Sequence, residues 1–335
     1  MNKTYIGFAV MILLGLVAPY TGAYPIFLMK ALCFALFACA FNLLLGFTGL
    51  LSFGHAAFFG TAGYAAGYAV KAWGFAPEFG ILFAVACAAL LGWLVRSGGL
   101  TPELGVLAGT GVAALCGLAV GLIAIRRQGI YFAMVTLAMA QMIYFVFLQV
   151  PFTGGEDGLQ GVPRGKLFGL ISLADDKLLY YVVLAVFVAV FLFIIRIVHS
   201  PYGQVLKAIR ENEPRAVSLG YDVDRYKLLA FVLSTAIAGL AGSMKTLVLG
   251  FATLSDAHWS LSGEVVLMTL LGGMGTFAGP VLGAFTIIGL QNFLADQVGS
   301  WINVIIGVIF VVCVVAFRKG FVGELLAWQQ RRAKR

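Results

Sequence analysis

Side chains that could carry acid–base or nucleophilic chemistry are sparse in this chain of 335 residues. The three histidines, His55, His199 and His258, are far apart in the sequence. No serine–histidine–aspartate set, no HExxH motif and no paired carboxylates within an apolar run accompany them. We therefore expect a protein that is not an enzyme and that has no catalytic residues.

Metal and nucleotide sites are not indicated either. All five cysteines lie in apolar runs without a CxxC motif or a histidine–cysteine cluster, so the sequence predicts structural thiols and no metal site. No GxxxxGK[ST] phosphate-binding loop occurs. We expect that the chain does not hydrolyse ATP itself and binds no cofactor.

The composition predicts an all-α, polytopic transmembrane helical bundle. Hydrophobic residues make up 61% of the chain and charged residues 11%, and the mean hydropathy is +1.00. A soluble domain needs more polar side chains to cover its surface, whereas lipid solvates an apolar exterior. At about 20 residues per crossing, residues 1–335 have room for roughly eight to ten spans in a single transmembrane domain.

Apolar runs predict where the spans lie. They cover 5–21, 25–46, 50–70, 79–95, 104–125, 129–150, 178–198, 228–250, 263–296 and 299–317. The first run follows Lys3 and could instead be a secretory signal cleaved near Ala23, although an uncleaved span is the preferred interpretation.

Basic residues set the predicted orientation. Of the 22 Lys and Arg residues, six lie in the tail 318–335 and five lie in the charged segment 200–227. The positive-inside rule places both segments in the cytoplasm and the acidic loop 151–177 outside. The lipid bilayer, rather than nucleic acid, therefore explains the formal net charge of +8.

The orientation constrains the run 263–296. It must begin and end outside, because 228–250 leads outward and 299–317 leads to the cytoplasmic tail. The run is long for one helix, and the sequence GGMGTFAGP at 272–280 interrupts it. It is therefore either two short crossings or a re-entrant pair with broken helices.

Broken helices indicate a translocation route, because non-helical backbone inside a membrane persists only where protein buries it or water lines it. We expect 46–63 and 270–280 to line this route. The residues assigned to it are Asn42, Ser52, His55, Glu264, Gly272, Gly273 and Gly275. The polar ones could equally be satisfied packing residues, and Glu264 an ordinary acid near a helix N-terminus. Lys245 is expected to extend toward the outer interface.

The charged segment 200–227 predicts two short helices. Ser200 and Pro201 favour a helix start. Pro214 predicts an interruption, and Gly220 can close the second helix. An apolar side beside a charged side suggests a surface for another protein. The alternative is a solvated loop whose charges only fix the topology.

Three motifs occur in order along most of the chain. They are NLLLGFTGLLSFGHAAFFGTAGY at 42–64, SPYGQVLKAIRENEPRAVSLGYDVDRYKLLAFVLSTAIAGLAGSM at 200–244 and SGEVVLMTLLGGMGTFAGPVLGA at 262–284. Together they resemble the permeases of ABC importers, and more narrowly the LivM-like side of the branched-chain amino acid permease family.

The resemblance implies a permease subunit in the bacterial cytoplasmic (inner) membrane. Its partners would be a homologous LivH-like permease, two cytoplasmic ATPase subunits that hydrolyse the ATP, and a periplasmic substrate-binding protein. The machine would import branched-chain or other hydrophobic amino acids by alternating access. Importers of urea and short amides share the motifs.

In this resemblance, 200–227 is the ATPase-coupling loop. The residues assigned to coupling are Leu206, Ile209, Arg210, Glu211, Glu213, Arg215, Ala216 and Gly220. Leu206 and Ile209 would point into a groove of the ATPase, and the basic side chains would meet acidic partner residues. Ala216 and Gly220 would permit close approach.

Two other classes of protein fit less well. A passive channel or secondary carrier for small neutral solutes would work alone, whereas a permease subunit is inert without its ATPases. A membrane enzyme acting on lipids would need a polar cluster at one interface, and the sequence shows none beyond 200–227.

Overall fold

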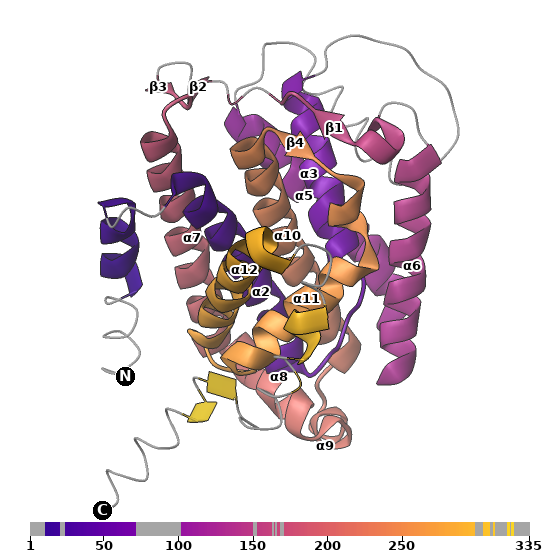
Figure 1. Ribbon diagram of the computed structural model, residues 1–335. Helices are drawn as coiled ribbons and strands as arrows, with labels where there is room; N and C mark the ends of the chain where they lie inside the picture. Colours follow the sequence, from indigo (N-terminus) through magenta and orange to yellow (C-terminus); the bar gives the residue numbers. More distant parts are fainter. Residues whose placement is uncertain are drawn as a thin grey trace, which may run out of the picture.

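A computed structural model describes residues 11–20, 24–71, 102–149, 153–162, 164, 166–167, 171–298, 304–308, 311, 320–321 and 323–324. Within these residues the chain folds as a helical membrane bundle, as the composition predicts (Figure 1). Five helices are long and apolar enough to cross a membrane. The predicted span 79–95 lies outside the described residues, as does most of 299–317.

The elements follow the predicted spans closely. The long helices are α2 (Pro25–Thr48), α3 (His55–Lys71), α5 (Pro102–Ala124), α6 (Ile130–Gln149), α7 (Asp176–His199) and α10 (Val223–Leu249). Helix α12 (Gly279–Val298) has 20 residues, as many as α6, and the shorter helices are α8 (Pro201–Glu211), α9 (Glu213–Ser218) and α11 (Trp259–Gly272). Short 3₁₀ helices occur at η1 (Ala18–Tyr20), η3 (Gly155–Asp157) and η4 (Leu254–Ala257).

Helices α2 and α10 form the centre of the bundle (Figure 1). Helix α2 has apolar residues on all of its sides, and 89% of its most hydrophobic stretch is buried. A helix that is apolar all round belongs inside a bundle. Helix α10 packs on α2, α3 and α5 through small residues, and a β-carbon at Gly242 would overlap the carbonyl group of Phe59.

Helices α6 and α7 lie at opposite edges of the bundle (Figure 1). Only 33% of the most hydrophobic stretch of α6 and 39% of that of α7 are buried within the chain. Their exposed side chains are nevertheless mostly apolar, including Phe145 and Phe193. Such faces are stable against lipid, which requires no polar cover.

Two small antiparallel strand pairs lie at the end of the bundle opposite α8 and α9 (Figure 1). Strand β1 (Leu159–Gln160) pairs with β4 (Phe251–Ala252), which joins the loop before α7 to the end of α10. Strand β2 (Lys166–Leu167) pairs with β3 (Ile171–Ser172). The predicted outer loop 151–177 is therefore joined to the segment that leads into α11.

The predicted interruption in 263–296 is confirmed, because α11 ends at Gly272 and α12 begins at Gly279. Helix α11 has 14 residues and is about 21 Å long, which is shorter than the hydrocarbon core of about 30 Å. It begins inside the bundle, where the Ser262 hydroxyl accepts a hydrogen bond from the Ala56 N–H at the start of α3. This length favours the interpretation as a re-entrant pair.

Two boundaries differ from the sequence predictions. Pro214 does not interrupt a helix, since α8 already ends at Glu211 and Pro214 is the second residue of α9. A proline is tolerated there because the first turn of a helix has no backbone acceptor for its N–H. Likewise, the run 50–70 becomes helical only at His55: α2 ends at Thr48, and Gly49 caps it with a left-handed φ of 78°.

Candidate coupling and translocation site

Side-chain caps fix the turns of the segment 200–227. The Ser200 hydroxyl accepts from the Gly203 N–H at 3.4 Å and starts α8. The Asn212 side chain accepts from the Arg215 N–H at 3.1 Å and starts α9, while Asp222 caps α10. Each capped start satisfies a backbone donor that would otherwise lack a partner. The segment is therefore an ordered pair of helices that joins α7 to α10.

One face of this pair is buried against the chain itself. Leu206 is fully buried in an apolar cluster that includes Leu44 of α2 and Phe231 of α10, and Ile209 clusters with Ala216 and Val223. The prediction that Leu206 and Ile209 point into a groove of a partner is wrong, because their own bundle provides the apolar surface that they need. Ala216 is buried in the same way and does not approach a partner.

Tyr202 adds a second anchor between α8 and α10. Its ring stacks on that of Tyr226 with centroids 5.6 Å apart, and its hydroxyl donates to the Tyr226 carbonyl oxygen at 2.9 Å. Burial raises the pKa of the Tyr202 phenol, with the neighbouring Tyr226 adding to the effect. The phenol therefore stays protonated and keeps its donor role.

Glu213 is engaged within the chain. Its carboxylate lies 2.6 Å from the ammonium group of Lys227, whose side chain is only 5% exposed. It also accepts from the Gln128 side chain at 3.0 Å. The start of α9 is thereby joined both to α10 and to the turn between α5 and α6.

The exposed side of α9 and the turn that follows it carry apolar residues that the sequence prediction missed. Val217 is 56% exposed, Leu219 68% and Tyr221 40%, next to the exposed Arg215. Gly220 lies between them with a left-handed φ of 86°. We call Arg215, Val217, Leu219, Gly220 and Tyr221 the α9 patch. The sequence signal for it was the run VSLGY, whose apolar residues have no helical period that would bury them.

Helix α8 contacts the end of α2. The Arg210 guanidinium donates to the carbonyl oxygen of Gly46, in the last turn of α2. Its aliphatic part lies against Gly49, where a β-carbon would be 3.2 Å from Arg210 Cγ. The Lys207 ammonium group is 6.0 Å from the centre of the Phe47 ring. The first non-helical segment, 49–54, therefore begins beside α8.

The second break, 273–278, meets the same end of α2 through Asn42, one turn before Gly46. The Asn42 amide donates to the Thr276 carbonyl oxygen at 2.8 Å and accepts from the Gly275 N–H at 3.0 Å. The Phe47 and Phe277 rings lie 5.6 Å apart. Close approach requires glycine at 46, since a β-carbon there would be 2.8 Å from the Gly275 nitrogen. Asn42 and Gly275, both assigned to the route, thus lie together.

Gly272 and Gly273 shape the turn after α11. Gly273 has a φ of 117°, a backbone conformation that a side chain disfavours. A β-carbon at Gly272 would overlap the Gly279 carbonyl group, so the end of α11 lies directly against the start of α12. These glycines therefore make the tight break between two packed helices.

Ser52 and His55 lie in the first break and are enclosed. The Ser52 hydroxyl accepts from the Gly54 N–H at 3.3 Å. His55 Nε2 is 2.8 Å from the Ser234 hydroxyl, which in turn donates to the Ala40 carbonyl oxygen at 2.6 Å. The Ser234 oxygen is thus the acceptor, and His55 carries its proton on Nε2. Three phenylalanine rings contact the imidazole edge-on, those of Phe41, Phe58 and Phe231. His55 therefore connects α3 to α2 and α10.

Glu264 lies apart from the other residues assigned to the route. It is partly exposed on α11, more than two helical turns before Gly273, and accepts from the Gln291 side chain of α12 at 3.2 Å. Lys245 does not extend to the outer interface. It forms a buried ion pair with Asp256, with side-chain exposures of 8% and 9%. The sequence could not reveal this pair, because Asp256 looked like an ordinary loop acid.

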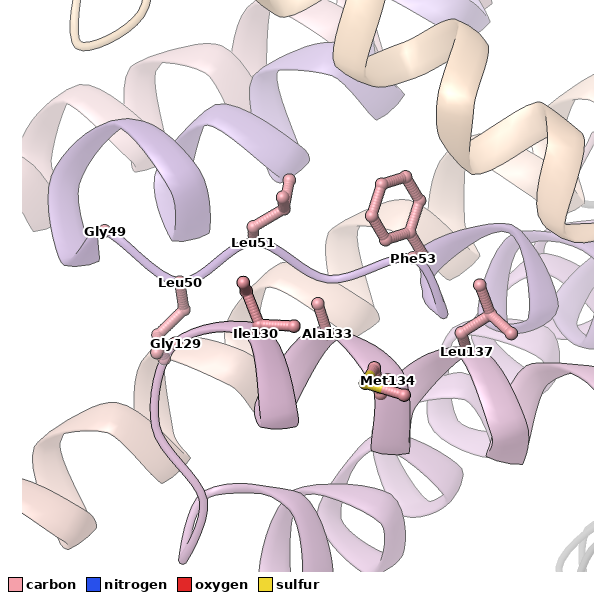
Figure 2. A pocket seen from close by; sticks show the side chains of 9 residues that line it. All are labelled: Gly49, Leu50, Leu51, Phe53, Gly129, Ile130, Ala133, Met134 and Leu137. Carbon is pink, nitrogen blue, oxygen red and sulfur yellow. The ribbon is translucent and has the colours of Figure 1, made fainter.

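A cavity of about 390 Å³ opens beside the first break (Figure 2). Figure 2 shows residues of the non-helical segment on one side and residues of α6 on the other. It is lined by Gly49, Leu50, Leu51, Phe53, Gly129, Ile130, Ala133, Met134 and Leu137. None of the polar residues assigned to the route lines it, so it is an apolar recess at the edge of the bundle.

Comparisons with known proteins agree with the motifs. A family model described as "Branched-chain amino acid transport system / permease component" matches residues 24–314. The high-affinity branched-chain amino acid transport system permease protein LivM of Escherichia coli K12 is 26% identical over 283 residues, 76% of this chain and 60% of that protein. LivM of Salmonella typhimurium is 29% identical over 203 residues, 54% of this chain and 48% of that protein.

More distant relatives and solved structures complete the comparison. The autoinducer 2 import system permease protein LsrC of Klebsiella pneumoniae is 30% identical over 141 residues, 40% of this chain and 41% of that protein. The chain spans about half to three fifths of the length of the LivM relatives that it matches. No solved structure matches the chain significantly.

Proposed function

The chain belongs to the family of permease components of branched-chain amino acid transport systems, and from this premise we propose that it is the membrane-spanning subunit of an ATP-driven importer. It carries branched-chain or other hydrophobic amino acids into the cytoplasm by alternating access. Separate ATPase subunits hydrolyse the ATP, and the chain itself binds no cofactor and no metal ion.

The observation that carries this proposal is the link from α8, through the end of α2, to both broken segments. Arg210 bonds to Gly46 at the end of α2, and Asn42 on the same helix bonds to the 273–278 break. Hydrogen bonds to a charged group are stronger than those between neutral groups. A displacement of α8 therefore reaches the two non-helical segments through α2, without crossing a flexible loop.

The α9 patch is the surface that receives the displacement. Apolar side chains surrounded by charge are typical of the centre of a protein interface. Arg215 at its edge suits an acidic partner residue. We assign the contact with the ATPase subunit to this patch, together with the exposed Glu211 at the end of α8.

The remaining parts of the machine follow from the family. The chain pairs with a homologous second permease in the bacterial inner membrane, and a periplasmic binding protein delivers the substrate. The α8–α9 end and the basic tail 318–335 face the cytoplasm, in accord with the positive-inside rule. Urea and short amides are the alternative substrates, since their importers share the motifs. The LsrC relative is named for a different solute, autoinducer 2.

The experiment that tests this function is purification of the tagged chain with its associated subunits, followed by uptake of labelled leucine into proteoliposomes with and without ATP. The proposal predicts co-purified ATPases and ATP-dependent uptake. Uptake by the chain alone would contradict it and indicate a channel or carrier. Co-purification with uptake of urea or an amide instead of leucine would support the ATP-driven importer and change only its proposed substrate.

A matched pair of variants tests the docking surface in the same assay. Leu219→Asp places a charge at the most exposed apolar residue of the α9 patch. Ser218→Ala removes a neighbouring hydroxyl that bonds only to the Arg215 carbonyl oxygen of its own helix. We expect the ATPases to be lost from the first variant and retained by the second.

A further inference from the structure

Four charged side chains gather within the bundle at the end away from α8. Lys30 lies five residues after the start of α2, Lys245 lies near the end of α10, and Asp256 and Glu264 belong to η4 and α11. The charge of Lys30 interacts with those of the other three. An ionisable group inside a membrane protein is costly and points to a function unless a partner neutralises it.

Two of the four neutralise each other. Lys245 and Asp256 form a buried ion pair, and the Lys245 ammonium group also lies 5.9 Å from the rings of Phe34 and Phe59. Asp256 further accepts from the Thr253 N–H at 3.2 Å. This pair is satisfied within the chain, so its role is to hold the segment before α11 against α10.

Lys30 and Glu264 are the other two charged residues of this group. Within the part of the chain that the structure describes, neither forms an ion pair, and Glu264 has only the neutral Gln291 amide as a hydrogen-bond partner. Both are partly exposed, unlike the pair beside them. Helices α2, α11 and α12, which carry Lys30, Glu264 and Gln291, pack on one another. One cation and one anion, neither in an ion pair within the described residues, therefore lie within electrostatic range of each other.

We propose that Lys30 and Glu264 bind the carboxylate and the ammonium group of a zwitterionic substrate, with the Gln291 amide as a third, neutral contact. This assignment rests on the proposed import function and names a recognition site for it. It places the substrate's charged end at the outer half of the route, before the substrate reaches the breaks beside α8.

Electrostatics select a zwitterion over singly charged ligands. A cation attracted by Glu264 is repelled by Lys30 and Lys245, and an anion attracted by Lys30 is repelled by Glu264 and Asp256. An α-amino acid carries both charges on neighbouring atoms and is attracted by both residues. A neutral solute can hydrogen-bond to either residue, but it lacks the charge–charge attraction that both residues offer to a zwitterion.

The test uses the assembled importer in proteoliposomes and measures leucine uptake, ATP hydrolysis and subunit assembly. Lys30→Met and Glu264→Gln remove one charge each, and a double variant removes both. Thr286→Val is the matched control, because the hydroxyl of this exposed α12 residue bonds to the Leu282 carbonyl oxygen of its own helix. Lys30→Arg keeps the positive charge.

We expect each single variant to lower leucine uptake by about tenfold or more at limiting substrate, because it loses a charge-assisted contact. The double variant should be at least as impaired as either single variant, with assembly intact. Lys30→Arg should retain much of the uptake, and Thr286→Val all of it.

Three outcomes would overturn the assignment. If the double variant regains wild-type uptake, the two charges only balance each other. If the variants fail to assemble, the charges are structural. If the wild-type complex shows ATP-dependent uptake of an uncharged amide but not of leucine, the protein is still an importer subunit, but the zwitterion site is refuted. Absence of any ATP-dependent uptake would instead refute the proposed function.

Discussion

Helices α8 and α9 are neighbours of similar character, yet they use their apolar residues in opposite ways. Leu206 and Ile209 of α8 are buried in the bundle, whereas Val217 of α9 and Leu219 and Tyr221 just beyond it are exposed. Arg210 of α8 bonds inward to α2, and Arg215 of α9 lies in solvent. In the proposed function the pair separates two tasks: α8 would transmit a displacement to the membrane helices, and α9 would offer the surface that receives it.

Removing the buried anchor of α8 should have the largest effect. Leu206→Ala creates a cavity in a fully buried position and should lower the free energy of unfolding by about 2–5 kcal/mol. Thermal unfolding in detergent measures it. The control, Leu219→Ala, should change stability by no more than about 0.5 kcal/mol, since that side chain is 68% exposed. Equal losses in the two variants would abolish the contrast between the helices.

The two ion pairs of the segment give the next contrast. Lys227→Met leaves Glu213 without its ammonium partner and should cost about 1–3 kcal/mol of stability. Arg225→Met breaks an exposed pair with Asp222 at 2.7 Å and should cost less than about 1 kcal/mol. Chemical denaturation of both variants measures the difference, and a larger loss for Arg225→Met would contradict the assignment of Lys227 as the internal anchor.

The α9 patch should affect binding instead of stability. Leu219→Ala should weaken the affinity for the ATPase subunits by about tenfold, because exposed apolar residues at an interface centre dominate binding. Titration of purified ATPase onto the immobilised permease complex measures the affinity. Unchanged affinity, with the chain folded, would place the docking surface elsewhere.

Two glycines, one after α9 and one in α11, give the smallest expected effects, and the two effects have opposite signs. Gly220→Ala forces a side chain into a left-handed φ of 86° and should cost about 1 kcal/mol. Gly263→Ala lies in helix α11 with open space around the new β-carbon and should stabilise the chain by about 0.5–1 kcal/mol. Paired thermal unfolding checks the opposite signs.

The apolar runs predicted most of the fold. Span positions, the interruption after Gly272 and the two short helices of 200–227 all follow from hydropathy, glycine and capping signals that act over short distances. The start of α3 at His55 was less predictable, because tertiary hydrogen bonds to Ser234 and Ser262 decide it. The position of Pro214 was also less predictable, because the cap at Asn212 decides where α9 begins.

The site was predicted only in part, because facing and pairing depend on tertiary contacts. Asn42 and Gly275 were assigned to one route from separate motifs, and they do lie together. The predicted direction of the Leu206 and Ile209 side chains was wrong, since an amphipathic helix can bury its apolar face in its own chain or in a partner. The Lys245–Asp256 pair joins residues on different elements, and neither local sequence indicates it.

The central claim is that Arg210 transmits the movement of α8 to the end of α2 and thereby to both breaks. The most direct test is the number of leucine molecules imported per ATP hydrolysed by the assembled importer carrying Arg210→Ala, with Arg225→Ala as the exposed control. We predict retained assembly and hydrolysis with uptake per ATP reduced about tenfold, from loss of a charge-assisted hydrogen bond. An unchanged ratio in Arg210→Ala would contradict the account.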